Sequence, residues 1–424
     1  AEVEAISQAR AYAPKTEGPI VAPTNRRPRG FNWEDWGRLD AMEVLDIAKQ
    51  RFLPDPRRIY LTGHSMGGHG TWYLGATYAG QWAAIAPCAG YPTMADYGSH
   101  DGKVPTAATS PMQQILVRAA GPGNTLKLAK NYKAAGVYIF HGDADPTVSV
   151  EYARQMKKVL ADFHPDFSYY EYPGGSHWFG NESVDWPPIF EYFKLHNIPL
   201  SKDVNEIDFT TASVGISSTQ HWIKILQQQK PFAFSNVQLK RNPKAKRIEG
   251  STLNVERLQI DLSDFQEGDT VSLTLDGYNF QQIVSKSDPL ILLNENGKWQ
   301  KANPAQASDK SEKRNGGFKE AFRNRMVFVY GTHGTLEENG WMKNKARYDA
   351  ESWYYRGNGA VDLIADSEFD VKPYADRGIV LFGNMSNNTA AASLLSDCPV
   401  QVKSGSVTDG KDQLSGDDLG IYQV

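Results

Sequence analysis

The chain has 424 residues, of which 40% are hydrophobic and 22% are charged, and its net charge is −4. This composition is typical of a soluble globular protein, and the length predicts two or three domains. The small negative charge gives no reason to expect nucleic acid or an anionic membrane as a partner, and no apolar run approaches the roughly 20 residues that cross a bilayer. The two cysteines, Cys88 and Cys398, exclude a disulfide framework and a cysteine-rich metal site, so we expect two separate buried thiols.

The amino-terminal part of the chain predicts little of a sheet before the first notable motif. Residues 1–12 predict a helix, residues 18–23 a short strand, and residues 33–52 a helix that Asn32 can cap. Residues 58–62 then predict a buried strand. Because so few strands come first, we expect an upstream segment of the same gene product to complete the sheet and to carry any targeting sequence.

A glycine-rich motif follows that strand. Residues 63–68 read Gly-His-Ser-Met-Gly-Gly, and residues 69–79 can form a helix. Strand, Gly-x-Ser-x-Gly and helix in succession are the layout of a nucleophile elbow, in which the serine sits on a sharp, strained turn. Such a turn needs small neighbours, which Gly63 and Gly67 provide. The competing interpretation is a glycine-rich structural turn.

Strands and helices alternate after the motif. This alternation predicts a doubly wound parallel sheet with helices on both faces, interrupted by an insertion at residues 91–136 that resembles a lid or substrate-side cap. The predicted strands are residues 82–87, 137–140 and 167–172, and the predicted helices are residues 112–119, 126–134, 150–163 and 186–196.

Two further polar residues follow strands in the order that serine hydrolysis requires. A serine hydroxyl needs an imidazole to take its proton and a carboxylate to hold that imidazole. Asp145 follows the strand at residues 137–140, and His177 lies in a glycine-rich loop after the strand at residues 167–172. Since active-site residues collect at the carboxyl ends of parallel strands, we predict a Ser65, Asp145 and His177 triad. Asp143 competes for the acid position but is expected to brace the turn.

The remaining parts of the predicted site are less specific. The N–H group of Met66, at the start of the helix, is expected to supply one oxyanion donor, and the second is expected upstream of the chain. His64, Trp178 and His100 are candidates for the substrate side of the cleft, although packing or ordinary lid structure would also explain them. His141 is expected to order the acid loop.

The second half of the chain has a different pattern. We predict a catalytic domain at residues 1–200, an antiparallel β-rich module at residues 203–300 and a second α/β unit at residues 318–424. The predicted strands of this last unit are residues 326–330, 361–364, 378–382 and 400–402, and its predicted helices are residues 336–354 and 388–395. In this last unit, residues 331–335 (Gly-Thr-His-Gly-Thr) follow a predicted strand and open a predicted helix. Such a loop could hold an anion, but its spacing matches neither standard phosphate loop, and a structural turn is the favoured interpretation.

Three stretches carry a family resemblance. Residues 58–72 resemble the elbow of α/β-hydrolase esterases, nearest to the polyhydroxybutyrate-depolymerase and feruloyl-esterase-like group and to predicted peptidases of the prolyl oligopeptidase superfamily. Residues 141–148 resemble the acid loop of these enzymes, with Asp145 at the acid position, and residues 175–177 resemble their histidine loop. The resemblance covers about residues 1–200. Residues 330–332 and 355–359 are similar to a carboxyl-terminal extension of large bacterial hydrolases of this superfamily.

The resemblance implies a serine hydrolase that needs no metal or cofactor. It favours cleavage of a small ester or an acylated carbohydrate, with plant polysaccharide acyl groups as one candidate, and a periplasmic or secreted location. A peptidase of the prolyl oligopeptidase type is the second interpretation, although no propeller-like repeat is present. A third is a non-catalytic carbohydrate-binding or scaffolding protein with a degenerate hydrolase unit.

Overall fold

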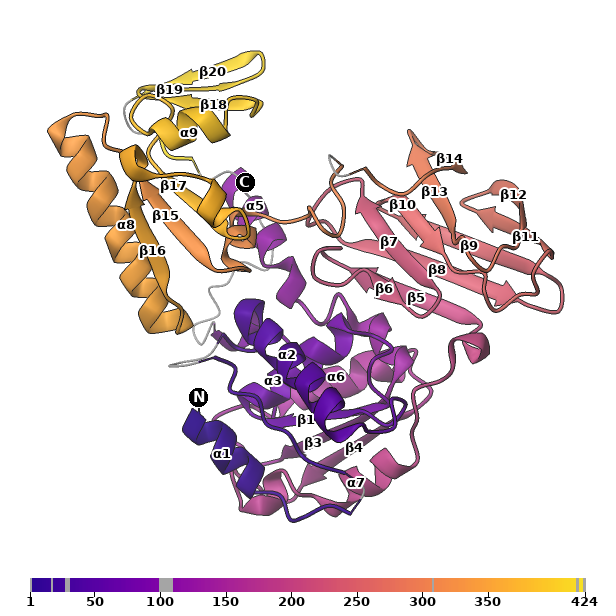
Figure 1. The fold of residues 1–424 in the computed structure, drawn as a ribbon. Helices are drawn as coiled ribbons and strands as arrows, with labels where there is room; N and C mark the ends of the chain where they lie inside the picture. Colours follow the sequence, from indigo (N-terminus) through magenta and orange to yellow (C-terminus); the bar gives the residue numbers. More distant parts are fainter. Residues whose placement is uncertain are drawn as a thin grey trace. The chain divides into compact units, whose positions relative to one another are not determined.

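The structure is a computed structural model that describes residues 2–16, 18–26, 31–98, 110–306, 309–416 and 419–421. The chain divides into two compact units. The larger unit consists of Val3–Asn25 and Phe31–Asn315, and most of the smaller unit is Gly316–Val424. Figure 1 labels the helices and strands of both units.

A four-stranded parallel sheet forms the first part of the larger unit (Figure 1). Its strands are in the order β1-β2-β3-β4, and every neighbouring pair is parallel, as the alternation of strands and helices predicts. The strands are β1 (Tyr60–His64), β2 (Ala84–Cys88), β3 (Gly136–Gly142) and β4 (Phe167–Tyr172), and the main helices are α1 (Glu2–Arg10), α2 (Asp35–Phe52), α3 (Met66–Thr77), α6 (Glu151–Ala161) and α7 (Pro187–Lys194).

Helices cover both faces of this sheet because its central strands are almost entirely apolar. Every residue of β2 and β3 is buried. On one face, side chains of α2, α3 and α6 pack around Ile85, Val137 and Ile139. On the other face, Ile189 and Phe193 of α7 pack against the sheet. This double cover holds the carboxyl ends of the four strands in place, and the candidate site lies there.

Three expectations about this part differ from the structure. Residues 18–23 are not a strand. Asn32 does not cap α2, whose N-cap is Glu34; the Asn32 side chain instead accepts a hydrogen bond from the Tyr91 hydroxyl at 2.6 Å. The insertion contains α4 (Met94–Gly98), α5 (Pro111–Ala119) and the 3-10 helices η1 (Gly121–Gly123) and η2 (Ala129–Ala134), the last where a longer α-helix was expected.

Two five-stranded sheets form the second part of the larger unit (Figure 1). One is β14-β13-β10-β7-β6 and the other is β12-β11-β9-β8-β5; all pairs are antiparallel except β11 with β9. Their alternating inward side chains, Phe209, Leu258 and Leu273 among them, share one core. The strands are β5 (Glu206–Thr211), β6 (Thr219–Gln220), β7 (Ile223–Gln228), β8 (Ser235–Asn242), β9 (Arg247–Leu253), β10 (Val255–Ile260), β11 (Thr270–Leu275), β12 (Tyr278–Ile283), β13 (Leu290–Glu295) and β14 (Lys298–Lys301).

A buried asparagine joins the β-rich part to the parallel-sheet part. Asn131 donates hydrogen bonds to the carbonyl oxygens of Ala76 at 2.7 Å and Thr210 at 2.8 Å, and it accepts one from the Thr210 N–H at 2.8 Å. Ala79 of the parallel-sheet part belongs to the core of the β-rich part. The two parts therefore share buried contacts within one compact unit.

The smaller unit contains a parallel and an antiparallel sheet. The parallel sheet has the order β16-β15-β17, with strands at the predicted positions: β15 (Met326–Tyr330), β16 (Val361–Ala365) and β17 (Gly378–Phe382). Its helices are α8 (Leu336–Gly357) and α9 (Thr389–Leu394). The strand expected near residue 400 does not join this sheet: β18 (Val400–Lys403) pairs antiparallel with β19 (Ser406–Asp409), which pairs with β20 (Asp412–Ser415).

Cys88 is buried as expected, whereas Cys398 is only partly buried.

Candidate active site

The turn between β1 and α3 holds Ser65 in a strained conformation. Its φ is 59° and its ψ is −118°, a region that residues with a side chain rarely adopt. The N–H of Ser65 donates to the carbonyl oxygen of Cys88, at the end of β2, at 3.0 Å. The serine thus sits on a sharp turn at the carboxyl edge of the sheet, which is the geometry that the sequence predicts for a nucleophile elbow.

The glycines of the motif have unequal roles in this turn. A Cβ on Gly63 would lie 2.4 Å from the carbonyl oxygen of Gly67, and a Cβ on Gly68 would lie 2.4 Å from that of Cys88. A Cβ on Gly67 would meet nothing within 4 Å. The expectation that neither Gly63 nor Gly67 has room for a side chain is therefore right for Gly63 and wrong for Gly67. A side chain on Gly63 would collide with the backbone of Gly67.

Backbone contacts hold the loops after β3 and β4 together. The N–H of Ala144 donates to the carbonyl oxygen of Gly175 at 3.0 Å, and a Cβ on Gly142 would lie 2.3 Å from that same oxygen. Asp143 accepts a hydrogen bond from the N–H of Gly174 at 2.6 Å. Asp143 thus braces the histidine loop, and the two loops present Asp145 and His177 side by side.

Ser65, His177 and Asp145 form a continuous chain of hydrogen bonds. The His177 Nε2 lies 2.9 Å from the Ser65 hydroxyl oxygen, and the His177 Nδ1 lies 2.8 Å from Oδ2 of Asp145. The three residues come from loops that follow three different strands, separated by 112 and 32 positions in the sequence. The structure therefore brings together the three residues that the sequence singled out.

The environment of Asp145 keeps its carboxyl group ionised. Its side chain is fully buried. Burial would raise its pKa, but hydrogen bonds from His141, His177 and the N–H groups of Val148 and Thr147 outweigh that effect, and the pKa is lowered. A buried negative charge beside Nδ1 favours the tautomer of His177 in which Nδ1 carries the proton and Nε2 can accept one from a hydroxyl.

His141 does what the sequence suggests by ordering the acid loop. Its Nε2 lies 2.8 Å from the carbonyl oxygen of Val148 and 3.3 Å from Oδ2 of Asp145. The imidazole thus spans the loop that carries Asp145 and fixes the position of its carboxylate.

His64, predicted on the substrate side, packs behind His177. Its Nε2 lies 2.7 Å from the carbonyl oxygen of His177, and the two rings are 4.8 Å apart. Burial, followed by the neighbouring His177, lowers the pKa of His64 to about 4. An uncharged His64 must donate from Nε2 to that carbonyl, so its position favours support of His177 over contact with a substrate.

The other predicted residues lie around this core. Met66 is the first residue of α3, where backbone N–H groups have no partner within the helix. Trp178 is 46% exposed and packs edge to face against His64, so it lies at the rim beside His177. His100 lies outside the described residues.

Asn25 is a supporting residue that the sequence did not single out. It is buried, and its side-chain oxygen accepts hydrogen bonds from the N–H groups of Phe31 at 3.3 Å and Trp33 at 3.0 Å. Its side-chain nitrogen lies 3.5 Å from the sulfur of Met66. No sequence spacing links Asn25 to the Ser65 motif, because the contact depends on how the chain folds back 41 positions earlier.

The described residues contain neither a candidate metal site nor a candidate membrane-spanning helix. Across the part of the chain that the structure describes, no group of three or more His, Cys, Asp or Glu side chains could hold a metal ion. No helix in the described ranges has the length and apolar character needed to cross a membrane.

Comparison with known proteins agrees with the fold of this region. Residues 29–193 match the model of the prolyl oligopeptidase family. The first part of the larger unit, a parallel sheet with helices on both faces, has the α/β-hydrolase fold. An uncharacterized secreted protein of Arthroderma benhamiae is 26% identical over 270 residues, which is 61% of this chain and 29% of that protein. A bifunctional acetylxylan esterase/xylanase of Neocallimastix patriciarum is 36% identical over 70 residues, 15% of this chain and 10% of that protein.

This chain spans less than a third of the length of either of those relatives. Among solved structures, a putative dipeptidyl aminopeptidase IV from Bacteroides ovatus has a TM-score of 0.31 and 21% identity, covering 38% of this chain and 22% of the other. A thermostable esterase has a TM-score of 0.27 and 22% identity, covering 38% and 37%.

Proposed function

We propose that the α/β-hydrolase part hydrolyses carboxylic esters through an acyl-enzyme on Ser65. The observation that carries this proposal is the unbroken chain of hydrogen bonds from Ser65 through His177 to the buried carboxylate of Asp145. A strained serine at the carboxyl edge of a parallel sheet, with both partners already in hydrogen-bonding distance, is arranged for nucleophilic attack on a carbonyl carbon.

In the proposed reaction, the Ser65 oxygen adds to the acyl carbonyl carbon while Nε2 of His177 takes the hydroxyl proton. Asp145 holds the opposite nitrogen and stabilises the imidazolium that forms. The negative oxygen of the tetrahedral intermediate faces the N–H of Met66 at the start of α3. The intermediate collapses as His177 protonates the departing alcohol, and water then releases the acid by the reverse sequence of proton transfers.

The proposed substrate class is a small ester or an acylated carbohydrate. The partial match to an acetylxylan esterase/xylanase favours an acetylated sugar, and Trp178 at the rim offers an exposed aromatic face for it. A periplasmic or secreted location fits such a substrate and fits the printed description of the Arthroderma relative as secreted.

Ester turnover can be tested directly with the full chain. We expect hydrolysis of p-nitrophenyl acetate and release of acetate from acetylated xylan, with both activities lost in the variant Ser65→Ala. The same fold measured by circular dichroism in parent and variant would show that only the chemistry has changed. Equal turnover by parent and Ser65→Ala would refute the proposal.

A peptidase is the second candidate, because residues 29–193 match the prolyl oligopeptidase family. The same triad could cleave an amide, and the two functions differ in the leaving group. A Pro-containing chromogenic peptide, assayed beside the esters, separates them: a kcat/KM for the peptide above that for the esters would replace the esterase proposal with the peptidase.

A further inference from the structure

The parallel sheet of the smaller unit has the topology of a ligand site. The central strand β15 is followed by α8, and Ala350 and Trp353 of that helix pack on one face of the sheet with Met326. The neighbouring strand β17 is followed by α9, and Ala390 of that helix packs on the other face with Val327. Adjacent strands whose helices leave to opposite faces open a crevice at their carboxyl ends, and open α/β sheets bind ligands there.

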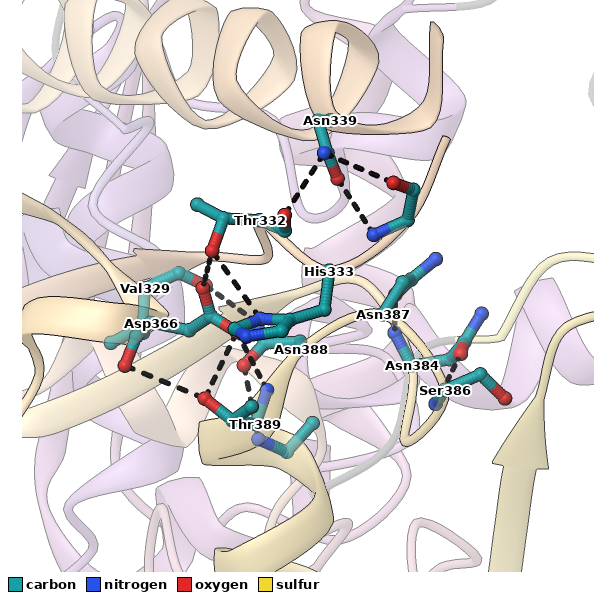
Figure 2. A network of polar contacts seen from close by, with 12 residues as sticks. Val329, Thr332, His333, Asn339, Asp366, Asn384, Ser386, Asn387, Asn388 and Thr389 are labelled. Atoms are coloured by element: carbon teal, nitrogen blue, oxygen red, sulfur yellow. Dashed lines mark hydrogen bonds and ion pairs between the residues drawn. The ribbon is translucent and has the colours of Figure 1, made fainter. Parts of the chain in front are cut away.

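A buried carboxylate lies at this edge of the sheet. Asp366, which follows β16, accepts hydrogen bonds from the Thr332 hydroxyl at 2.6 Å, the Thr389 N–H at 2.7 Å and the Thr389 hydroxyl at 3.0 Å. Nδ1 of His333 lies 3.1 Å from the same carboxylate, whose side chain is fully buried (Figure 2). Asp366 thus joins the loops after all three strands, which contribute Thr332 and His333, Asp366 itself, and Thr389.

The loops are held rigidly around this carboxylate. The N–H of His333 donates to the carbonyl oxygen of Asn387 at 3.1 Å, and Asn388 donates from its side chain to the carbonyl oxygens of Val329 and Phe382 at 3.1 and 2.9 Å. A Cβ on Gly331 would lie 2.3 Å from the Asn387 carbonyl oxygen. The sheet edge is therefore preformed, with the β17–α9 loop fixed beside His333 (Figure 2).

The exposed groups at this edge are those that bind hydroxyls. Half of the His333 side chain is exposed, and with Nδ1 donating to Asp366 an uncharged ring presents Nε2 as an acceptor. On the neighbouring loop, the side-chain nitrogen of Asn384 makes one contact with the residues that the structure describes, a long one of 3.5 Å to the Ser404 hydroxyl, which leaves it available as a donor. Ser386 is exposed beside it.

The chemistry of the edge disfavours charged ligands. The Asp366 carboxylate already accepts from four donors, and the second carboxylate at this edge, Glu338, accepts from the N–H of Thr335 at 2.7 Å. In the described residues no group of three potential metal ligands exists. The same buried negative charge opposes an anion at the start of α8. A neutral ligand with several hydroxyl groups needs no set of metal ligands and is not repelled by this negative charge.

We propose that this edge is a saccharide-binding site, in which Nε2 of His333 accepts a hydrogen bond from a sugar hydroxyl while Asn384 and Ser386 contact neighbouring hydroxyls. The choice of a sugar among polyhydroxylated ligands rests on the acylated-carbohydrate substrate proposed for Ser65. The binding itself needs no chemistry at Ser65, so the two proposals can fail separately.

The test is calorimetric titration of the full chain, carrying Ser65→Ala to prevent turnover, with xylohexaose, cellohexaose and mannohexaose. We expect at least one to bind, and His333→Ala and Asn384→Ala each to weaken that binding about tenfold, the effect of losing one good hydrogen bond. His333→Gln, which keeps an acceptor, should retain part of the affinity. Lys411→Ala, in the β19–β20 turn, is the matched control and should bind as the parent does.

Two results would overturn this site. One is that none of the three oligosaccharides binds at millimolar concentration. The other is that an oligosaccharide binds to His333→Ala and to Asn384→Ala as tightly as it binds to the parent. Turnover of p-nitrophenyl acetate, which carries no sugar, by the chain with an intact Ser65 reports on the triad, whereas sugar binding by the chain carrying Ser65→Ala reports on this edge.

Discussion

The unequal roles of the elbow glycines lead to a sharp prediction about Gly63 and Gly67. A Cβ at position 63 would lie 2.4 Å from the carbonyl oxygen of Gly67, whereas ordinary contacts begin near 3.4 Å. The turn in Gly63→Ala must therefore open by about 1 Å, and because backbone rather than a flexible side chain blocks the way, we expect a loss of roughly 1–3 kcal/mol of stability. A displacement of that size between Ser65 and His177 costs about 100-fold in turnover.

Gly67→Ala is the matched control for this prediction. A Cβ there meets nothing within 4 Å, and residue 67 lies within α3, so alanine should stabilise the helix by up to about 1 kcal/mol. The assay is kcat for p-nitrophenyl acetate together with the free energy of unfolding in urea. The steric account of the elbow would be wrong if Gly63→Ala kept kcat within threefold of the parent. It would also be wrong if Gly67→Ala lost as much kcat and as much free energy of unfolding as Gly63→Ala.

Three further predictions concern separate parts of the larger unit. Asp145→Asn should lower kcat by roughly 100- to 10,000-fold, because it removes the charge that fixes the His177 tautomer. Asp143→Asn keeps an acceptor for the Gly174 N–H and should lower kcat less than about tenfold. If kcat fell more in Asp143→Asn than in Asp145→Asn, the acid would be reassigned. Asn131→Ala removes three buried hydrogen bonds, two of which join the parallel-sheet part to the β-rich part, and should lower the free energy of unfolding in urea by roughly 2–4 kcal/mol; a loss below 1 kcal/mol would contradict that role. The folded-state pKa of His64, about 4, is below its ordinary value of 6.5, so the stability that uncharged His64 contributes is present above pH 6.5 and is lost as the pH falls toward 4. Between pH 7 and pH 5 the parent should lose about 2 kcal/mol more than His64→Gln, which does not titrate there, and equal losses in the two proteins would refute this linkage.

The candidate triad could be predicted from sequence because each of its residues follows a strand with a clear pattern. The apolar runs at β1, β3 and β4 predict where three parallel strands end, and parallel strands bring their carboxyl ends to one edge. The Asp143 and Asp145 alternatives were also separable, because the residue nearer the strand tends to brace a turn. The tertiary support could not be predicted in this way: the contact of Asn25 with Met66 and the packing of His64 behind His177 depend on the path of distant segments.

The β-rich part and the smaller unit show a different limit of sequence reasoning. In β8 every second residue is buried, but the order of strands in two sheets depends on pairings between segments far apart in the chain. β18 illustrates this point. Its short apolar pattern predicts a strand equally well whether it extends the parallel sheet or starts a separate antiparallel one, and only the pairing with β19 decides.

Two of the carboxylate–imidazole pairs, Asp145 with His177 and Asp366 with His333, show why similar residues support different proposals. At the carboxyl edge of β3, Asp145 holds Nδ1 of His177, and a strained serine meets the opposite nitrogen at 2.9 Å. At the carboxyl edge of β15, Asp366 holds Nδ1 of His333, but the nearby Thr332 hydroxyl lies toward the same nitrogen, at 3.3 Å, and donates to the carboxylate. A hydroxyl in that position cannot pass its proton to Nε2. The first pair therefore supports the proposal that His177 activates Ser65, whereas the second leaves Nε2 of His333 for the external hydroxyl proposed above.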